Sequence, residues 1–470
     1  MLVTFVIGYI LVTLGLGFWC ARRVKSSADF VSAGRQLPLI LNSFALFALW
    51  YGSETIFGAS AVFMEKGLLG VIEDPFGAAL CLILFSVVFA RRLYRMNLFT
   101  LGDLFRNKYG RKVEVIASVF MIISFFGYVA AQLVALGLLI HSLIGIGLET
   151  SIIASAVIVG TYTVVGGMWA ISVTDFLQSV VIILGLGWVT YTLVSEAGGI
   201  GLVIESAPDG FFRFIPEAKP LGWIEYFGAW SVIGLGSLAS QDVFQRVNAA
   251  KSEKSAVLAG YLGGGIYLLF SMFPLIIILS VKKLYPELQV TDTQQSIPEV
   301  ILLHSSLPVQ IFLFGALISA IFSTCSGAIL APASLMAENV IKPLSRNRLS
   351  EKKFLLSLRM SVVAITITGL IMALGSKNIY ELVGESSILG LVSMLIPMTA
   401  AIFWKNANAL GAISSMILGF IFWLVAEHVL STQIPALFYG ISGGLIGLVA
   451  GNFGSKSINK KIEGKHHRYN

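Results

Sequence analysis

Glu54 is the side chain with the clearest capacity for chemistry, because it stands in the middle of the apolar run LILNSFALFALWYGSETIFGASAVFM (39–64). An acidic side chain at the centre of a membrane helix costs about 2.5–3.5 kcal/mol and normally marks a pathway for ions or solutes. We therefore expect Glu54 to line a cavity. The alternative is a structural pairing with helix ends or with a basic side chain.

Hydroxyl side chains collect in a second apolar run, FGALISAIFSTCSGAILAPASLMAENV (314–340). Such hydroxyls often bond only to the backbone one turn earlier in their own helix. The other interpretation is that the oxygens of Ser323 and Thr324, with carbonyls freed in the run around Glu54, form a cage for a hard monovalent cation. Neutral oxygens of this kind suit sodium.

The composition places these residues in a membrane protein. Of 470 residues, 56% are hydrophobic and 12% are charged, whereas soluble domains average about 25% charged residues. A soluble enzyme is therefore excluded, and no residues suggest covalent catalysis or an organic cofactor. The net charge of +7 does not indicate nucleic acid, because the basic residues fall in short loops between apolar runs. The cysteines lie in or beside apolar runs and are interpreted as small hydrophobic residues: Cys20, Cys81 and Cys325.

Apolar runs of about 20 residues, the length that a bilayer requires, predict thirteen spans in one all-α transmembrane unit, residues 1–453. The first run has no cleavage site and is expected to be a retained helix. The expected spans are 2–20, 38–64, 71–91, 115–142, 147–166, 174–195, 222–245, 255–281, 308–337, 354–375, 380–404, 408–428 and 431–451.

The orientation follows from the basic residues. Alternate loops and the tail hold 26 of the 32 Lys and Arg, and such loops face the cytoplasm. We expect the N-terminus outside, a basic cytoplasmic tail at 454–470 and a position in the cytoplasmic (inner) membrane. His466 and His467 in this tail are expected to be solvated rather than to bind metal. No obligatory protein partner is evident beyond the lipid bilayer.

Two spans are interrupted by glycine and polar residues at membrane depth. The second contains Trp50-Tyr51-Gly52-Ser53-Glu54-Thr55, and the seventh contains Gly234-Leu235-Gly236-Ser237. Irregular backbone in a membrane is tolerated where it lines a cavity. Because these spans open two consecutive five-helix halves, at about 38–195 and 222–404, the pattern predicts an inverted-repeat transporter with ligands at the breaks. The alternative is that the glycines serve close helix packing.

Three stretches resemble the sodium/solute symporter family over roughly residues 1–450: TYTVVGGMWAISVTDFLQ (161–178), FQRVNAAKSEKSA (244–256) and SAIFSTCSGAIL (319–330). The resemblance implies a LeuT-like fold with 5+5 inverted repeats. It also implies a sodium site made by the carbonyls of Ala48, Tyr51 and Ala320 with the hydroxyls of Ser323 and Thr324.

The resemblance also assigns Asp175 to the family's aspartate linked to sodium coupling, whereas the residues alone indicate a helix cap in a cytoplasmic turn. A second sodium site stays open, because Ser326 offers one hydroxyl near Asp175 and Gly327 offers none. The family's substrate specificities transfer less cleanly. Gly234–Ser237 replaces the aromatic gate of sugar transporters, and Ser240 aligns with the second cage tryptophan of choline transporters.

These observations predict a sodium-coupled symporter that imports a small organic solute. An organic cation or zwitterion, such as an amino acid or related metabolite, is favoured because acidic and aromatic side chains suit charge pairing and cation–π contact. The alternatives are a membrane solute sensor and a proton-coupled symporter with Glu54 as the carrier. The expected substrate residues are Trp50, Glu54, Thr55, Asp74, Trp230, Ser240 and Gln241.

Overall fold

The computed structural model describes residues 1–286, 294, 296–345, 349–375, 378–430 and 432–466. Helices dominate this part of the chain, and ten of them are long and apolar enough to cross a membrane. The all-α membrane class is therefore confirmed. The count is ten rather than the expected thirteen for two reasons. The spans at 38–64 and 222–245 are each broken into short halves, and those at 147–166 and 174–195 run together.

Brief 3₁₀ or π-helical turns (η) join several of the described α-helices. In chain order the α-helices are α1 (Leu2–Ala21), α2 (Ser27–Ser32), α3 (Leu39–Trp50), α4 (Ala59–Lys66), α5 (Ala78–Leu84), α6 (Arg91–Arg95), α7 (Gly102–Tyr109), α8 (Arg111–Ile144), α9 (Leu148–Glu196), α10 (Ile200–Glu205), α11 (Pro220–Gly236), α12 (Gln241–Ala249), α13 (Glu253–Phe270), α14 (Met272–Leu284), α15 (Ser296–His304), α16 (Leu307–Leu335), α17 (Lys342–Leu344), α18 (Glu351–Gly375), α19 (Ile379–Gly390), α20 (Ile396–Phe403), α21 (Ala409–His428) and α22 (Ala436–His466).

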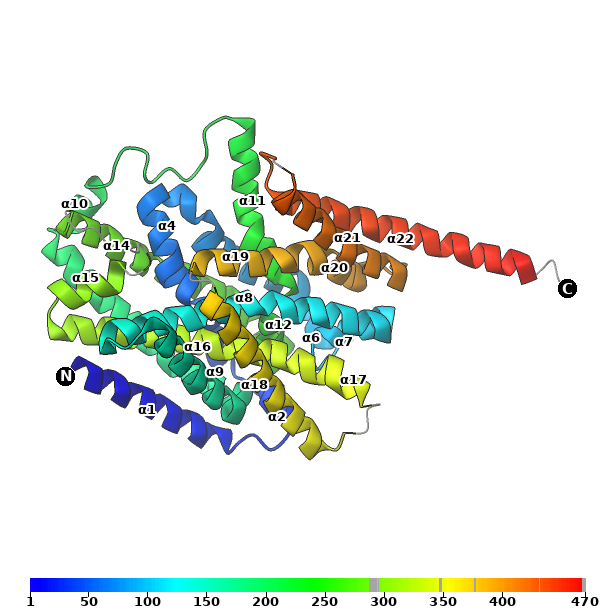
Figure 1. Cartoon of the computed structure of the whole chain (residues 1–470), viewed down its shortest axis with the longest axis horizontal. Helices are drawn as coiled ribbons and strands as arrows, with labels where there is room; N and C mark the ends of the chain where they lie inside the picture. Colours follow the sequence, from blue (N-terminus) through cyan, green and yellow to red (C-terminus); the bar gives the residue numbers. More distant parts are fainter. Residues whose placement is uncertain (287–293, 295, 346–348, 376–377, 431, 467–470) are drawn as a thin grey trace.

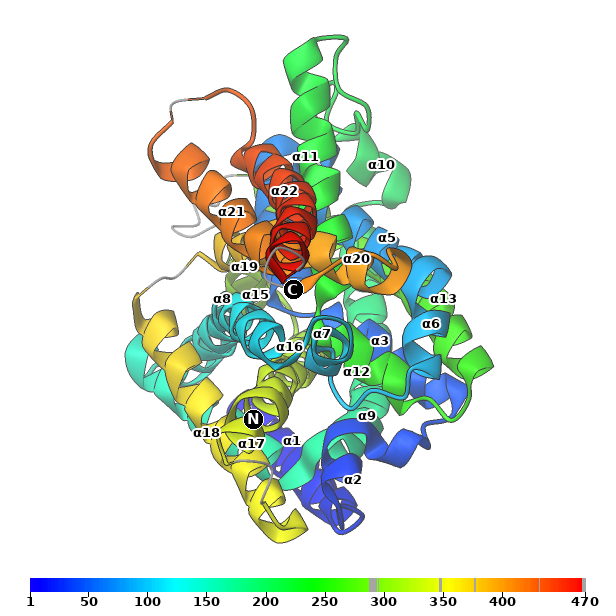
Figure 2. The same ribbon diagram turned by 90° about the vertical axis from the view of Figure 1, so that its right-hand side faces the viewer.

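Helix α16 forms the centre of the bundle. Every residue from Leu313 to Leu335 is buried, and α16 packs against α8 and α9. In the view along the bundle, α1 and α18 lie on one side of α16, while α11, α21 and α22 lie on the opposite side (Figure 2). The hydroxyl-rich run of α16 is therefore enclosed by protein rather than by lipid.

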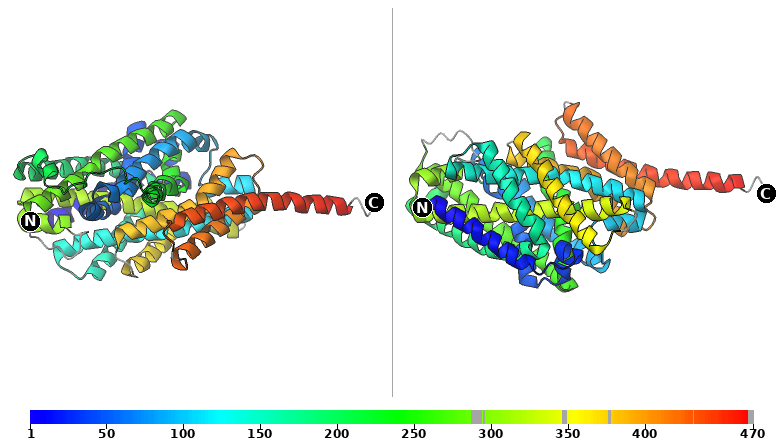
Figure 3. Two further views of the ribbon diagram at one scale, coloured as in Figure 1. Left: turned by 90° about the horizontal axis from the view of Figure 1, so that it is seen from above. Right: turned by 60° about the horizontal axis from the view of Figure 1, so that its bottom comes forward.

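The start of α1 and the end of α22 lie at opposite ends of the long axis (Figure 1). Helix α1 runs along the edge of the bundle beside α9, and α22 extends beyond the bundle (Figure 3). The expected tail at 454–470 begins inside α22, which continues to His466. His467 lies outside the described residues.

Several helices begin at residues suited to the position. Ser26 and Asp29 form a capping box at the start of α2, and the side chains of Ser252, Asn378 and Asn408 cap α13, α19 and α21. These side chains satisfy amides that have no partner in the first turn of a helix. The three cysteines are buried and unpaired with one another.

Helix α9 is interrupted at Gly167, where the backbone takes a φ of +55° and a ψ of −165°. A Cβ at this position would lie 2.7 Å from the ring of Phe30 and 2.9 Å from its carbonyl oxygen. Glycine provides both the positive φ and the close approach of α2. The break divides a 49-residue element whose length would otherwise reach about 74 Å.

Candidate functional site

The second and seventh expected spans are both broken, as their sequences predict. Helix α3 ends at Trp50, Tyr51 leaves helical geometry with a φ of −81° and a ψ of 69°, and helical structure resumes at η2 (Glu54–Gly58) before α4. In the seventh span, α11 gives way to the turn η6 (Ser237–Ala239), and α12 begins after the extended Ser240.

Carbonyls in the last two turns of α3 receive side-chain donors from three other helices. Arg246 Nε of α12 donates to the oxygen of Ala45 at 2.9 Å. Thr324 Oγ1 of α16 donates to Ala48 at 2.9 Å, and the hydroxyl of Tyr128 in α8 donates to Leu49 at 3.0 Å. An unpaired backbone group at membrane depth costs several kcal/mol. These contacts therefore stabilise the end of α3 at the break and connect it to α8, α12 and α16.

The five residues expected to bind sodium are gathered at this break. Ser323 and Thr324 both face the Ala48 carbonyl, at 3.4 and 2.9 Å. Ala320 precedes them by one turn of the same buried helix. Tyr51 is the first residue beyond α3. This arrangement brings neutral oxygens from two helices together, and binding of sodium to them stays a prediction.

Asp175 contacts the predicted ion site directly. Its Oδ1 accepts a hydrogen bond from Ser323 Oγ at 2.5 Å, and its Oδ2 lies 3.4 Å from Arg246 Nη2. Because the Ser323 proton points to Asp175, the oxygen lone pairs of Ser323 are free to face a cation. The interpretation of Asp175 as a helix cap is wrong, since this residue is fully buried inside α9.

Gly327 makes room for the buried pair of Asp175 and Arg246. A Cβ at position 327 would lie 2.6 Å from Arg246 Nη2, so the glycine leaves room for the guanidinium group. Ser326, expected near a second sodium site, donates its hydroxyl to the Ser323 carbonyl at 2.9 Å.

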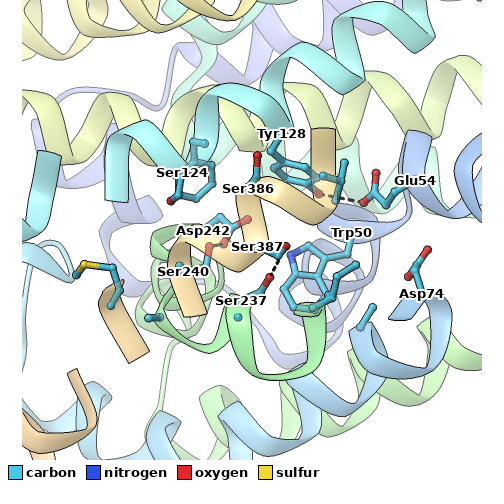
Figure 4. A pocket seen from close by; sticks show the side chains of 18 of the residues that line it. Trp50, Glu54, Asp74, Ser124, Tyr128, Ser237, Ser240, Asp242, Ser386 and Ser387 are labelled. Atoms are coloured by element: carbon cyan, nitrogen blue, oxygen red, sulfur yellow. Dashed lines mark hydrogen bonds between the residues drawn. The ribbon is translucent and has the colours of Figure 1, made fainter. Parts of the chain in front are cut away.

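A cavity with a volume of about 50 Å³ opens beside the two breaks. Its lining combines acidic, aromatic and hydroxyl side chains (Figure 4). The polar and aromatic residues that line it are Trp50, Glu54, Asp74, Ser124, Phe125, Tyr128, Ser237, Ser240, Asp242, Tyr267, Ser386 and Ser387.

Each of the three carboxylates in the lining is held by neutral donors. Glu54 Oε2 accepts from Gln132 Nε2 at 2.8 Å, and Glu54 Oε1 accepts from the hydroxyl of Tyr128 at 3.2 Å. The single hydroxyl proton of Tyr128 is therefore shared between the Leu49 carbonyl at the end of α3 and Glu54. The amide oxygen of Gln132 also accepts from the backbone N–H of Ser53 at 3.0 Å.

Asp242 and Asp74 are held differently. Asp242 Oδ1 accepts from the backbone N–H of Val243 at 2.7 Å and from the hydroxyl of Ser240. Asp74 Oδ1 accepts from the hydroxyl of Tyr267, whereas Asp74 Oδ2 is buried without a hydrogen-bond partner among the described residues. In the view of Figure 4, Glu54 and Asp74 lie on one side of Trp50, and Asp242 lies on the other.

The structure divides the expected substrate residues into two groups. Trp50, Glu54, Asp74 and Ser240 line the cavity. Thr55 lies behind it, where its hydroxyl is 2.6 Å from that of Tyr267.

The remaining two expected residues do not line the cavity. Trp230 belongs to an aromatic cluster with Phe76, Phe214 and Tyr226. Gln241 accepts a hydrogen bond from the backbone N–H of Leu101 at 2.7 Å. A role for either residue in substrate binding stays a prediction.

Sequence reasoning missed several polar residues of the site, among them Tyr128, Gln132, Asp242 and Tyr267. A signal existed for the first two, because they are one turn apart in an otherwise apolar part of α8 and therefore share a face. Asp242 directly follows the second break, where an acidic residue in the first helical turn is a recognisable feature. No comparable pattern surrounds Tyr267.

Comparison with known protein families gives one match over most of the chain. The model described as the sodium:solute symporter family matches residues 30–419. High-affinity choline transporter 1 of Caenorhabditis elegans is 26% identical over 466 residues, covering 93% of this chain and 79% of that protein. The high-affinity proline transporter PutP of Bacillus subtilis is 25% identical over 427 residues, covering 86% of this chain and 87% of that protein.

Comparison with solved structures identifies the fold. A sodium-coupled sialic acid symporter in a substrate-bound, outward-open state aligns with a TM-score of 0.81 at 20% identity, covering 96% of this chain and 97% of that one. Mhp1, a nucleobase-cation-symport-1 family transporter in a closed conformation, aligns with a TM-score of 0.63 at 15% identity, covering 93% and 96%. The fold is LeuT-like.

Proposed function

Because this multi-pass membrane protein belongs to the sodium:solute symporter family, whose members are transporters rather than enzymes, we propose that it couples sodium to the import of a small organic solute. It does so by alternating access. Sodium and solute bind together at the two breaks, and the loaded protein then opens to the other side of the membrane.

The observation that carries this proposal is the sharing of one segment by the two sites. The Ala48 carbonyl faces Ser323 and Thr324, and Trp50 and Glu54 on the same segment line the cavity. Any movement of this segment alters both sites. A ligand that binds one state of the segment more tightly therefore shifts the affinity for the other ligand, which is the thermodynamic requirement for coupling.

The proposal includes thirteen spans. The ten long candidates become thirteen when α9 is counted as two spans divided at Gly167 and when the broken pairs α3–α4 and α11–α12 are each counted as one. The core is then two repeats of five spans, approximately 38–195 and 222–404, within one unit of residues 1–453. An odd number of spans places the two termini on opposite sides of the cytoplasmic membrane. The distribution of Lys and Arg predicts that the N-terminus faces outward and that the basic tail faces the cytoplasm.

The solute we propose is a small organic cation, amino acid or related metabolite. Three carboxylates and several aromatic rings line the cavity, and such groups attract cationic parts of a ligand by charge pairing and cation–π contact. The family relatives named above include choline and proline transporters.

Uptake into proteoliposomes tests the proposal. Purified protein is reconstituted, and radiolabelled choline, proline, ethanolamine and putrescine are presented separately under an inward sodium gradient. We expect at least one to accumulate, and the accumulation to collapse when a sodium ionophore is added. Saturable binding without accumulation would instead favour the membrane-sensor alternative.

Proton coupling is the second candidate function. Glu54 is buried and held by the neutral donors Gln132 and Tyr128, which is an arrangement compatible with a carboxyl group that carries a proton. If an inward proton gradient drives uptake and the sodium gradient does not, proton coupling is established and the sodium assignment at Ser323 and Thr324 is wrong.

A further inference from the structure

In both broken spans, a carboxylate side chain lies at the start of the second helical half. Glu54 lies in the first turn of the helical segment that continues into α4, and Asp242 lies in the first turn of α12. Asp242 accepts the backbone N–H of Val243 at 2.7 Å. In transporters with broken helices, these positive helix starts are the positions that hold an anionic group of the solute. Here Asp242 fills this position at the second break, and Glu54 lies in the first turn at the first break, where Tyr128 and Gln132 of α8 hold it.

The charges around the cavity are unbalanced. Glu54, Asp74 and Asp242 line it, and among the described residues no Lys, Arg or His joins them in the lining. Arg246 lies one turn beyond Asp242, but its guanidinium group already contacts Asp175 and the Ala45 carbonyl. A buried carboxylate is unfavourable unless it is paired. The cavity therefore favours a solute that brings positive charge and carries no carboxylate.

Asp74 adds a requirement for hydrogen-bond donors. Its Oδ1 is occupied by the hydroxyl of Tyr267, while the fully buried Oδ2 has no hydrogen-bond partner in the described part of the chain. A buried acceptor left without a donor retains its desolvation cost. An N–H group of a bound solute removes this cost, whereas a quaternary ammonium has no N–H to donate.

A second acidic cavity adjoins the first and suggests the route of entry. Glu73, Glu225 and Glu427 line it, and it too has no Lys, Arg or His in its described lining. Neighbouring residues of three elements face the two cavities: Glu73 and Asp74, Val232 and Ile233, and Ile388 and Ser387. A cleft lined by one sign of charge concentrates ligands of the opposite sign.

We propose that the solute is a small protonated amine or amidine that has N–H donors and no carboxylate, and that Asp74 is the residue that selects for the N–H group. This inference rests on the proposed function, because it names the solute of the same site. Glu54 and Asp242 then repel a solute carboxylate instead of binding it.

Matched ligand pairs test the inference. The melting temperature of the purified full-length protein is measured, with and without sodium, against decarboxylated amines and the parent amino acids: pyrrolidine and proline, putrescine and ornithine, agmatine and arginine. A fourth pair, ethanolamine and choline, differs in N–H donors on a shared skeleton. A ligand that binds the folded state raises its apparent stability.

We expect at least one amine to bind roughly tenfold or more tightly than its amino acid, and ethanolamine more tightly than choline. A panel in which an amino acid or choline binds best, or in which no amine binds, overturns the inference. The measurements with and without sodium distinguish a failure of this inference from a failure of the proposed sodium coupling. If amines are selected equally with and without sodium, the solute class stands and sodium coupling fails.

The variant Asp74→Asn tests the selecting residue. The amide retains an acceptor for Tyr267, but its NH2 group replaces the unpartnered Oδ2 acceptor with a donor. The preference for ethanolamine over choline is therefore expected to fall about tenfold. Asp209→Asn, in an exposed loop, is the matched control and keeps the preference. An unchanged preference in Asp74→Asn assigns selection elsewhere and overturns this part of the inference. The wild-type panel decides the solute class even if the variant does not fold.

Discussion

At the residue scale, the hydroxyl of Ser323 contacts both Asp175 and the Ala48 carbonyl at the predicted sodium site. The hydroxyl donates to Asp175 at 2.5 Å and lies 3.4 Å from the Ala48 carbonyl. The hydrogen bond fixes the direction of the hydroxyl, so its oxygen faces the end of α3. Thr324 contacts the same carbonyl, but no carboxylate among the described residues orients its hydroxyl, and the two hydroxyls are therefore expected to contribute unequally.

Removal of either hydroxyl should weaken sodium binding. Ser323→Ala and Thr324→Ala each delete one oxygen ligand, and we expect the sodium concentration for half-maximal uptake to rise about tenfold, more for Ser323. The measurement is the sodium dependence of uptake. Ser155→Ala is the control, because this buried hydroxyl bonds only to the Ser151 carbonyl of its own helix in the described structure. Equal sodium dependence in all three variants would contradict the site.

The Asp175–Arg246 pair should show strong energetic coupling. Breaking a buried ion pair by removing one partner costs about 3–5 kcal/mol, because the other charge stays buried without compensation. Asp175→Ala and Arg246→Ala are each expected to lower the free energy of unfolding by about this amount. The double variant should lose much less than the sum of the two. A double-mutant cycle measures the difference, and strictly additive losses would show that the pair is not coupled.

At the element scale, two glycines set the approach of α11 to α19. A Cβ at Gly236 would lie 2.4 Å from the Ser387 carbonyl oxygen, and one at Gly390 would lie 2.8 Å from the Gly236 carbonyl oxygen. Both glycines line the cavity beside the second break. The packing of these two helices therefore determines the shape of the solute site.

Gly236→Ala should impair transport through this packing. The added methyl group meets backbone, which cannot move as a flexible side chain can, and overpacking of this kind costs about 1–3 kcal/mol. We expect a lower melting temperature and a reduced maximal rate of uptake. Gly265→Ala, on α13 where nothing lies within 4 Å of the added Cβ, is the matched control and should behave as the wild type. Wild-type uptake by Gly236→Ala would show that the contact yields without cost.

At the scale of the whole molecule, orientation in the membrane is the property that charge distribution predicts. Chemical labelling checks it, since the three native cysteines are buried and give little background. Asp209→Cys, in a loop, and Lys352→Cys, in the first turn of α18, place thiols at exposed positions assigned to opposite sides. In intact cells, an impermeant maleimide should label position 209 only, and position 352 should react after permeabilisation. The reverse pattern would invert the proposed topology.

The sequence by itself determined the elements. Apolar runs, glycine breaks and basic loops are local properties, and each follows from the preference of a segment for lipid or water. The membrane class and the two interrupted spans were therefore predictable. The fold was predictable through family motifs, because hydropathy alone does not specify how helices pack.

Tertiary structure alone decided which polar residues meet. Gln241 and Asp242 are neighbours in the sequence, but successive residues of a helix point about 100° apart. Asp242 faces the cavity and Gln241 faces Leu101. The pairing of Asp175 with Arg246 joins residues 71 positions apart, and it depends on the space that Gly327 leaves. Such contacts follow from the packing of helices against one another, which no local pattern encodes.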